Sequence, residues 1–185
     1  YRIHADGTLV GTLRTFDGGD MASAPEFFRV GMETTLPGRY STVDFYGKGP
    51  YETYSDRQSS ARTGHYVQSV AEQYHYGYVH PQESGTHVGL KWFRLTDDSG
   101  YGLEITSPAQ FSASALPFTR QDLTDFSSPF ASEELSSVSS RYSHSEELRP
   151  AAHEADRSRG VTHLNFDLVQ RGLGCILSLI HISEP

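Results

Sequence analysis

The sequence predicts an all-β fold, an antiparallel sandwich with one or two short helices. Several short segments alternate apolar and polar side chains with a period of two, which is typical of strands buried on one face. Turn-forming residues separate these segments, and no long apolar stripe indicates a major helix. Aromatic residues make up 12% of the chain, with eleven Tyr and ten Phe, and such side chains favour strands.

The chain is expected to begin with a hairpin, because Asp6-Gly7 separates two strand-like runs and an Asp-Gly pair suits a tight hairpin turn. Two further strands are predicted around Val30 and Val43, separated by a turn at Pro37-Gly38. The stretch 51–81 is rich in Tyr, Gln and His, and we expect it to form extended segments and loops.

A second hairpin is predicted over residues 88–106, with its turn at 97–100. In its first strand, Leu90 and Trp92 share one side of the alternation, which predicts that Trp92 packs in the core. The last strand is predicted at 162–168, where the alternation is regular.

Two short helices are expected to begin near Thr119 and Ser132, where a hydroxyl or an acidic first turn resembles a helix start. Residues 126–159 contain ten serines and few apolar anchors. We therefore expect an exposed, Ser-rich excursion there.

The net charge of −8 argues against a nucleic-acid partner, because such proteins present a basic face to the phosphates. The single cysteine, Cys175, excludes an internal disulfide and a four-thiolate metal site. The sequence contains no run of about 18 apolar residues, so no membrane-spanning segment is predicted. We also expect no association with a membrane. The chain begins at Tyr1 without a signal segment, and because its start is expected to be missing, both the cytoplasm and the periplasm stay open as locations.

Four segments carry a resemblance to a known family. They are Met32-Glu33 before a Leu-Pro turn, Phe45–Arg57 with the pattern Gly-x-Gly-Pro-x-Glu-x-Tyr-x-Asp-Arg, Tyr78–Gly85 with Pro-Gln-Glu-x-Gly, and Leu164–Cys175. In this order and spacing they resemble the last domain of lacZ-type β-galactosidases, glycoside hydrolase family 2. The resemblance covers roughly residues 27–175.

The resemblance implies an antiparallel supersandwich similar to galactose mutarotase. It also implies retaining hydrolysis of terminal β-D-galactosides such as lactose, carried out by two glutamates of a separate barrel domain. Those glutamates are expected upstream of Tyr1, so no catalytic residue is assigned in this chain. The domain would complete and close the sugar site of an exo-acting enzyme.

We expect a domain over residues 1–176, truncated at both ends. In the family a loop after the Gly-Leu-Gly-Cys-like stretch carries a tryptophan that stacks on the sugar, but here Leu177–Pro185 replaces it. These nine residues resemble the translation of a sequencing-library adaptor, which predicts a non-native tail. An ordinary terminal strand is the alternative, since the segment is apolar.

The candidate substrate-binding residues are few. Gly174 and Cys175 lie at the root of the family's tryptophan loop, and His80 and Glu83 flank Pro81-Gln82. Asp56 and Arg57 are expected to form an ion pair or a loop clamp. No metal ligands are assigned, because no histidine shows ligand spacing.

No cofactor is expected in this chain, whereas the resemblance implies a divalent cation (Mg or Ca), with Na in some members, for the full enzyme. The implied partners are a galactoside, the remaining domains of the enzyme and further copies in a homo-oligomer. Two alternatives stay open, a stand-alone aldose 1-epimerase and a non-catalytic carbohydrate-binding module. An epimerase needs a histidine and a carboxylate facing each other in a groove.

Overall fold

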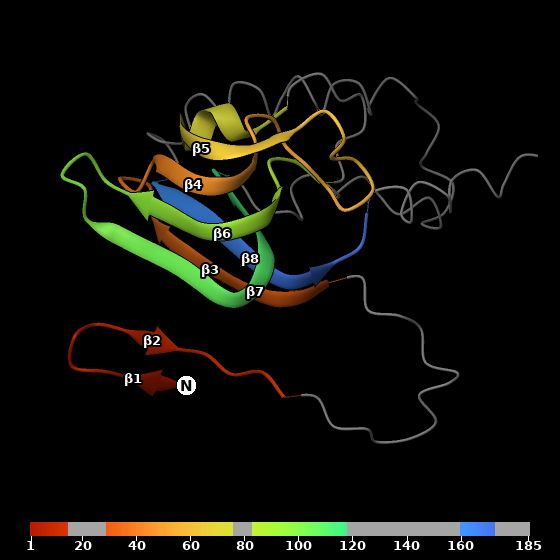
Figure 1. Ribbon diagram of the computed structural model, residues 1–185. Helices are drawn as coiled ribbons and strands as arrows, with labels where there is room; N and C mark the ends of the chain where they lie inside the picture. The colour runs from red at the N-terminus through yellow and green to blue at the C-terminus, as the bar shows by residue number, and fades with distance from the viewer. Residues whose placement is uncertain (15–28, 76–82, 118–159, 173–185) are drawn as a thin grey trace, which may run out of the picture.

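The computed structural model describes residues 1–14, 29–75, 83–117 and 160–172. Apart from one short 3-10 helix, their regular elements are all strands (Figure 1). The elements are β1 (Arg2–Ile3), β2 (Leu9–Val10), β3 (Arg29–Pro37), β4 (Thr42–Gly49), β5 (Arg62–Ser69), η1 (Val70–Gln73), β6 (His87–Thr96), β7 (Gly102–Leu116) and β8 (Val161–Gln170).

The strands form a two-stranded sheet, β1-β2, and a six-stranded sheet in the order β3-β8-β7-β6-β4-β5. Every neighbouring pair is antiparallel. The all-β antiparallel prediction is confirmed. The sheet brings β8, from the end of the described chain, between β3 and β7, so segments far apart in the sequence become neighbours.

Both predicted hairpins are confirmed. Arg2 pairs with Val10 across the first turn, where Gly7 has a φ of +88°. Leu95 pairs with Leu103 across the second, where Gly100 has a φ of +80°. Glycine adopts these left-handed conformations without the steric cost that a side chain would add.

Within residues 51–75, β5 is one of the extended segments expected there, whereas the short helix η1 was not predicted. Ser69 and Glu72 form a capping box at the start of η1, and the hydrogen bond from the Ser69 backbone lowers the pKa of Glu72. The helices predicted near Thr119 and Ser132 lie outside the described residues. So do the excursion at 126–159 and the tail at 177–185.

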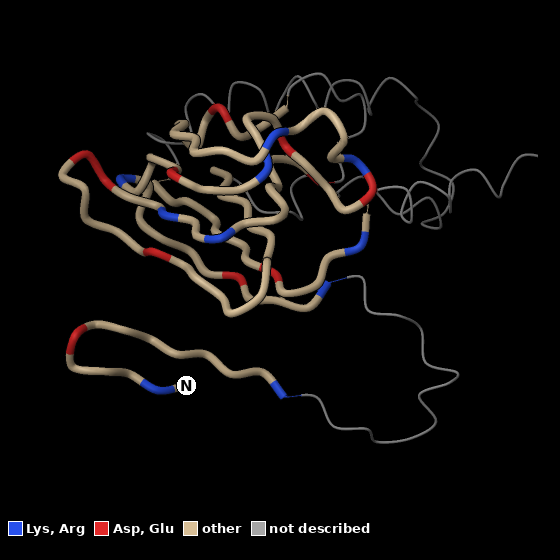
Figure 2. The backbone as a smooth tube through the Cα atoms, viewed as in Figure 1, with Lys and Arg blue, Asp and Glu red and all other residues tan. Residues whose placement is uncertain are grey.

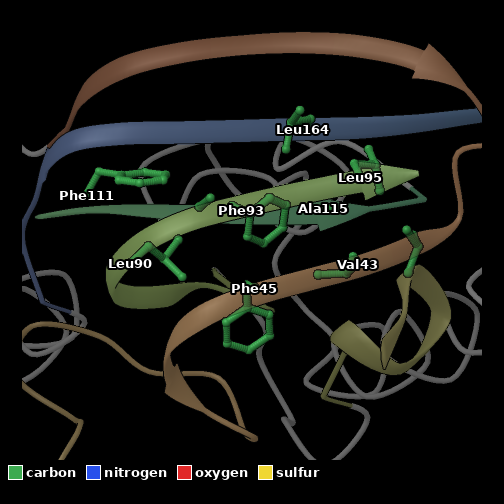
Figure 3. Close-up of a cluster of buried hydrophobic side chains, with 10 residues drawn as sticks. Val43, Phe45, Leu90, Phe93, Leu95, Phe111, Ala115 and Leu164 are labelled. Carbon is green, nitrogen blue, oxygen red and sulfur yellow. The ribbon is translucent and has the colours of Figure 1, made fainter. Parts of the chain in front are cut away.

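The hydrophobic core lies on one face of the six-stranded sheet (Figure 3). Phe45 in β4 and Phe93 in β6 are cross-strand partners with ring centroids 6.2 Å apart, and both are fully buried. The buried cluster consists of Val43, Phe45, Val70, Leu90, Phe93, Leu95, Phe111, Ala113, Ala115 and Leu164. Removing this apolar surface from water supplies the main stabilisation of the sheet.

The prediction that Trp92 packs in the core is wrong. The β6–β7 register shifts between Leu90 and Trp92, and both Leu90 and Phe93 are fully buried. An irregularity of this kind inverts the alternation of the residues beyond it. Trp92 therefore points to the opposite face, beside the half-exposed Tyr46.

Acidic and basic residues are interspersed over the strands and loops (Figure 2). Within the described ranges, no helix combines the length and the apolar character that crossing a membrane requires.

Candidate functional site

The loop after β4 contacts the loop before β6, and Glu52 lies at their junction. Its Oε2 atom accepts a hydrogen bond from the backbone N–H of Gly85 at 2.8 Å. The hydroxyls of Tyr54 and Ser84 donate to the same oxygen at 3.2 and 3.4 Å. Its Oε1 atom forms an ion pair with Arg57. The Glu52 side chain is only 8% exposed, so these contacts compensate for the burial of its charge.

Backbone contacts hold the same two loops in register. The Thr53 N–H donates to the Thr86 carbonyl at 2.6 Å, and the Val88 N–H donates to the Thr53 hydroxyl at 2.9 Å. Gly85 has a φ of +68°, and a Cβ there would lie 2.7 Å from the carbonyl oxygen of Gln73. Both the conformation and the space explain why the Pro-Gln-Glu-x-Gly element ends in glycine.

Arg29 at the start of β3 joins two carboxylates that lie far apart in the sequence. Its Nε atom lies 2.9 Å from Oδ2 of Asp167 in β8, and its Nη2 atom lies 3.4 Å from Oε2 of Glu83. The Asp167 side chain is 3% exposed. At the neighbouring bulge, a Cβ on Gly31 would overlap the Asp167 carboxylate, so glycine leaves room for the ion pair.

The loop Glu52–Arg57 also contacts the end of the described chain. A Cβ on Gly172 would overlap the carboxylate of Asp56, which therefore packs directly on the Gly172 backbone. Arg57 extends over the Tyr54 ring, 5.2 Å from its centroid, while it pairs with Glu52. Arg57 thus pairs with Glu52 and Asp56 packs on Gly172, while the expected ion pair or loop clamp of Asp56 with Arg57 stays a prediction.

Of the candidate substrate-binding residues, only Glu83 lies in the described part of the chain. It is nearly buried and forms an ion pair with Arg29. His80, Gly174 and Cys175 fall outside the described residues, so their roles stay predictions. Sequence reasoning missed Arg29 and Asp167 as the partners, because their pairing depends on strands that meet only in the folded sheet.

His87 is a buried histidine behind the Glu52 loop. Its ring lies against Phe45, with centroids 4.2 Å apart. Its nitrogens lie 2.7 Å from the side-chain amide oxygen of Gln73 and 3.2 Å from the Lys48 carbonyl. Burial lowers the pKa of His87 from 6.5 to about 4, so the ring is neutral near pH 7. A neutral imidazole enclosed in this way supports the packing of β6.

One histidine–carboxylate pair escaped the sequence reasoning. His65 Nε2 lies 2.6 Å from Oδ1 of Asp44, on the exposed face of the sheet. An acid/base pair for a sugar ring must leave room for the substrate between its two members. Here the two groups bond to each other, which does not favour epimerase chemistry.

Three carboxylates of the family motifs are held in ion pairs within the fold. Glu52 and Glu83 each face an arginine, and Asp167 shares the arginine of Glu83. Within the described ranges, no three His, Cys, Asp or Glu side chains come together as metal ligands. Together these contacts fix the loop after β4 and the loop before β6 against the end of β8.

Comparison with known proteins gives a consistent result. Residues 1–181 match the family model described as beta galactosidase small chain. The β-galactosidase BgaC of Bifidobacterium adolescentis is 38% identical over 104 residues, which cover 55% of this chain and 9% of that protein.

Two further relatives show the same pattern. A β-galactosidase of Priestia megaterium is 33% identical over 99 residues, 54% of this chain and 10% of that protein. One of Halalkalibacterium halodurans is 29% identical over 133 residues, 70% of this chain and 13% of that protein. The chain thus spans about a tenth of the length of the curated relatives it matches.

Proposed function

Because the chain belongs to the β-galactosidase small chain family, we propose that it is the carboxy-terminal β-sandwich domain of a longer β-galactosidase. The full enzyme hydrolyses terminal β-D-galactosides such as lactose and retains the configuration at the anomeric carbon. Retention requires two carboxyl groups, one as acid and base and one as nucleophile. In this proposal both belong to another domain, and the present domain completes and closes the sugar site.

The packing of Asp56 on Gly172 is the observation that carries this role. It joins the Glu52–Arg57 loop to the end of β8, where the chain continues into the Gly174-Cys175 stretch. Family members carry their sugar-stacking tryptophan after that stretch. A fixed starting point restricts where the following residues lie relative to a substrate, and correct placement lowers the entropic cost of binding.

The cation implied by the resemblance has no evident site in the described ranges. The carboxylates of Glu52 and Glu83 are engaged by arginines, and no group of three potential ligands is present there. In this proposal the cation binds to other domains, and no step of the role assigned here involves it.

The proposal is tested by recovering the full reading frame and expressing both the full-length protein and the 185-residue chain. The full-length protein is expected to release nitrophenol from a nitrophenyl β-D-galactoside, with the β-anomer as the first product by NMR. The 185-residue chain is expected to leave the substrate intact. A full-length protein that hydrolyses no galactoside, or a chain that hydrolyses it alone, would overturn the proposal.

The two alternatives are tested by separate measurements on the same two proteins. Freshly dissolved α-galactose should relax at its background rate in the presence of the 185-residue chain, as followed by optical rotation. Accelerated relaxation would instead assign an aldose 1-epimerase. Calorimetric binding of lactose by the chain, without hydrolysis by the full-length protein, would assign a carbohydrate-binding module.

A further inference from the structure

The outer face of the sheet, opposite the core, carries two rows of side chains across four adjacent strands. The register of β5, β4, β6 and β7 aligns them, and neighbouring strands lie about 4.8 Å apart. The aromatic row consists of His65, Tyr46, Trp92 and Thr106. The charged row consists of Val67, Asp44, Arg94 and Glu104.

The aromatic row is held in place by contacts within the face. The rings of His65 and Trp92 lie 5.5 Å apart, and the Arg94 guanidinium lies 4.5 Å above the Trp92 ring. Tyr46 is 39% exposed and Val67 59% exposed. Trp, Tyr and Arg are the side chains that most often dominate the energy of protein–protein interfaces.

The charges of this face are already paired with one another. Arg94 forms ion pairs with Glu104 and, at 3.7 Å, with Asp44. Asp44 also bonds to His65 at 2.6 Å. Covering the face with another protein surface would therefore bury compensated charges, which costs much less than burying an unpaired one.

The same contacts disfavour a sugar as the occupant. Arg94 covers a face of the Trp92 ring, which is where a pyranose would stack. The charged groups beside it, on Arg94, Glu104, Asp44 and His65, already bond to one another. A face with aromatic side chains and paired charges is suited to a protein surface.

The length of the related β-galactosidases indicates which protein would cover this face. The chain spans about a tenth of their length, so most of such an enzyme lies outside these residues. We propose that the aromatic and charged rows form the docking surface for another domain of the same β-galactosidase chain. This inference rests on the proposed function, because it requires a longer enzyme.

Hydroxyl-radical footprinting of the native full-length enzyme tests the proposal. Phe93, fully buried, and Tyr101, 75% exposed, define the lower and upper limits of oxidation within the same domain. Tyr46 and Trp92 are expected to react as slowly as Phe93. Oxidation of Tyr46 and Trp92 in proportion to their exposure in this structure would overturn the proposal.

Adding lactose to the footprinting reaction separates the two kinds of occupant. Protection that is present without the sugar and unchanged by it supports a protein surface. Reactive Tyr46 and Trp92 that become protected only with lactose would overturn the docking surface and assign a sugar platform.

A pair of lysine variants gives an independent readout. Thr106→Lys places an additional cation in the aromatic row, whereas Ser99→Lys places the same charge in the exposed turn of the same hairpin. Thr106→Lys should lower the Tm of the full-length enzyme by several degrees more than Ser99→Lys. Equal Tm values would contradict docking.

Failure of the docking surface and failure of the proposed function look different. An active galactosidase with fully reactive Tyr46 and Trp92 removes only the docking surface. A full-length protein without galactosidase activity removes the proposed function, whatever the footprint shows.

Discussion

The Glu52 carboxylate accepts a hydrogen bond from the backbone N–H of Gly85 at 2.8 Å, and this contact joins the two sequence elements most specific to the family. Glu52 lies in the loop after β4 and Gly85 in the loop before β6, 33 residues further along the chain. The two elements thus encode a loop junction in which a buried carboxylate bonds to the backbone of the facing loop, beside the Thr53–Thr86 backbone hydrogen bond.

Replacing Glu52 with Ala should lower the free energy of unfolding by about 2 to 3 kcal/mol, because the buried Gly85 N–H loses its acceptor. Glu52→Gln keeps an oxygen for Gly85 but loses the charge that pairs with Arg57. The Gln variant should fall between wild type and Ala in urea denaturation. Identical losses for both variants would show that the Gly85 contact contributes nothing.

Gly172→Ala should destabilise the fold by about 1 to 3 kcal/mol, since the new Cβ overlaps the Asp56 carboxylate. Combining it with Asp56→Gly removes the overlap, so the double variant should lose less than the sum of the two single losses. Additive losses in this cycle would mean that the two residues do not interact.

In the full-length enzyme, Gly172→Ala also tests the proposed role of this contact in substrate binding. Gly172→Ala should raise the KM for a nitrophenyl galactoside, and Asp56→Gly should restore part of it. Ser99→Ala, in an exposed turn distant from Gly172 in the sequence, serves as the control. An unchanged KM with a lowered Tm would limit the contact to a structural role.

Much of the fold follows from local sequence signals. Asp6-Gly7 and the turn at 97–100 determine their hairpins because positive φ angles are needed at Gly7 and Gly100. The alternation over 162–168 likewise predicted β8. Trp92 was misplaced because the bulge that inverts its side arises from pairing with β7, which the strand's own sequence does not reveal.

The candidate site was less predictable than the fold. Glu83 was singled out from its motif, but its partner Arg29 lies 54 residues away on another strand. Glu52 belongs to the Gly-x-Gly-Pro-x-Glu pattern, but the sequence assigned it no role because its contact with Gly85 forms only where the two loops meet in the fold. Such contacts depend on the strand order β3-β8-β7-β6-β4-β5, which local patterns do not specify.

Arg29→Met should cost about 3 to 5 kcal/mol, because it leaves the buried carboxylates of Asp167 and Glu83 without their cation. Arg39→Met is the matched control, since Arg39 is 66% exposed and lies 3.9 Å from Asp97. The control should cost less than about 1 kcal/mol. Equal unfolding free energies for the two variants would contradict a buried ion-pair cluster.

His87 should make the chain lose stability in mild acid. Burial lowers its pKa to about 4 in the folded state, whereas the unfolded value is near 6.5. Above pH 6.5 both states are neutral at this residue and its contribution is complete. As the pH falls from 6.5 towards 4, the unfolded chain takes up a proton that the folded chain refuses, and stability declines.

The difference between the two pKa values of His87 corresponds to about 3 kcal/mol at most. The measurement is urea denaturation of wild type and His87→Gln at several pH values between 4 and 7. Gln has no titrating group and is able to bond to the Gln73 amide and the Lys48 carbonyl that surround the ring. The free energy of unfolding of the variant should therefore depend less steeply on pH. The difference in slope corresponds to the uptake of up to one proton on unfolding over this range. Equal slopes for the two proteins would mean that His87 takes up its proton as readily folded as unfolded, and hence that the ring is open to water.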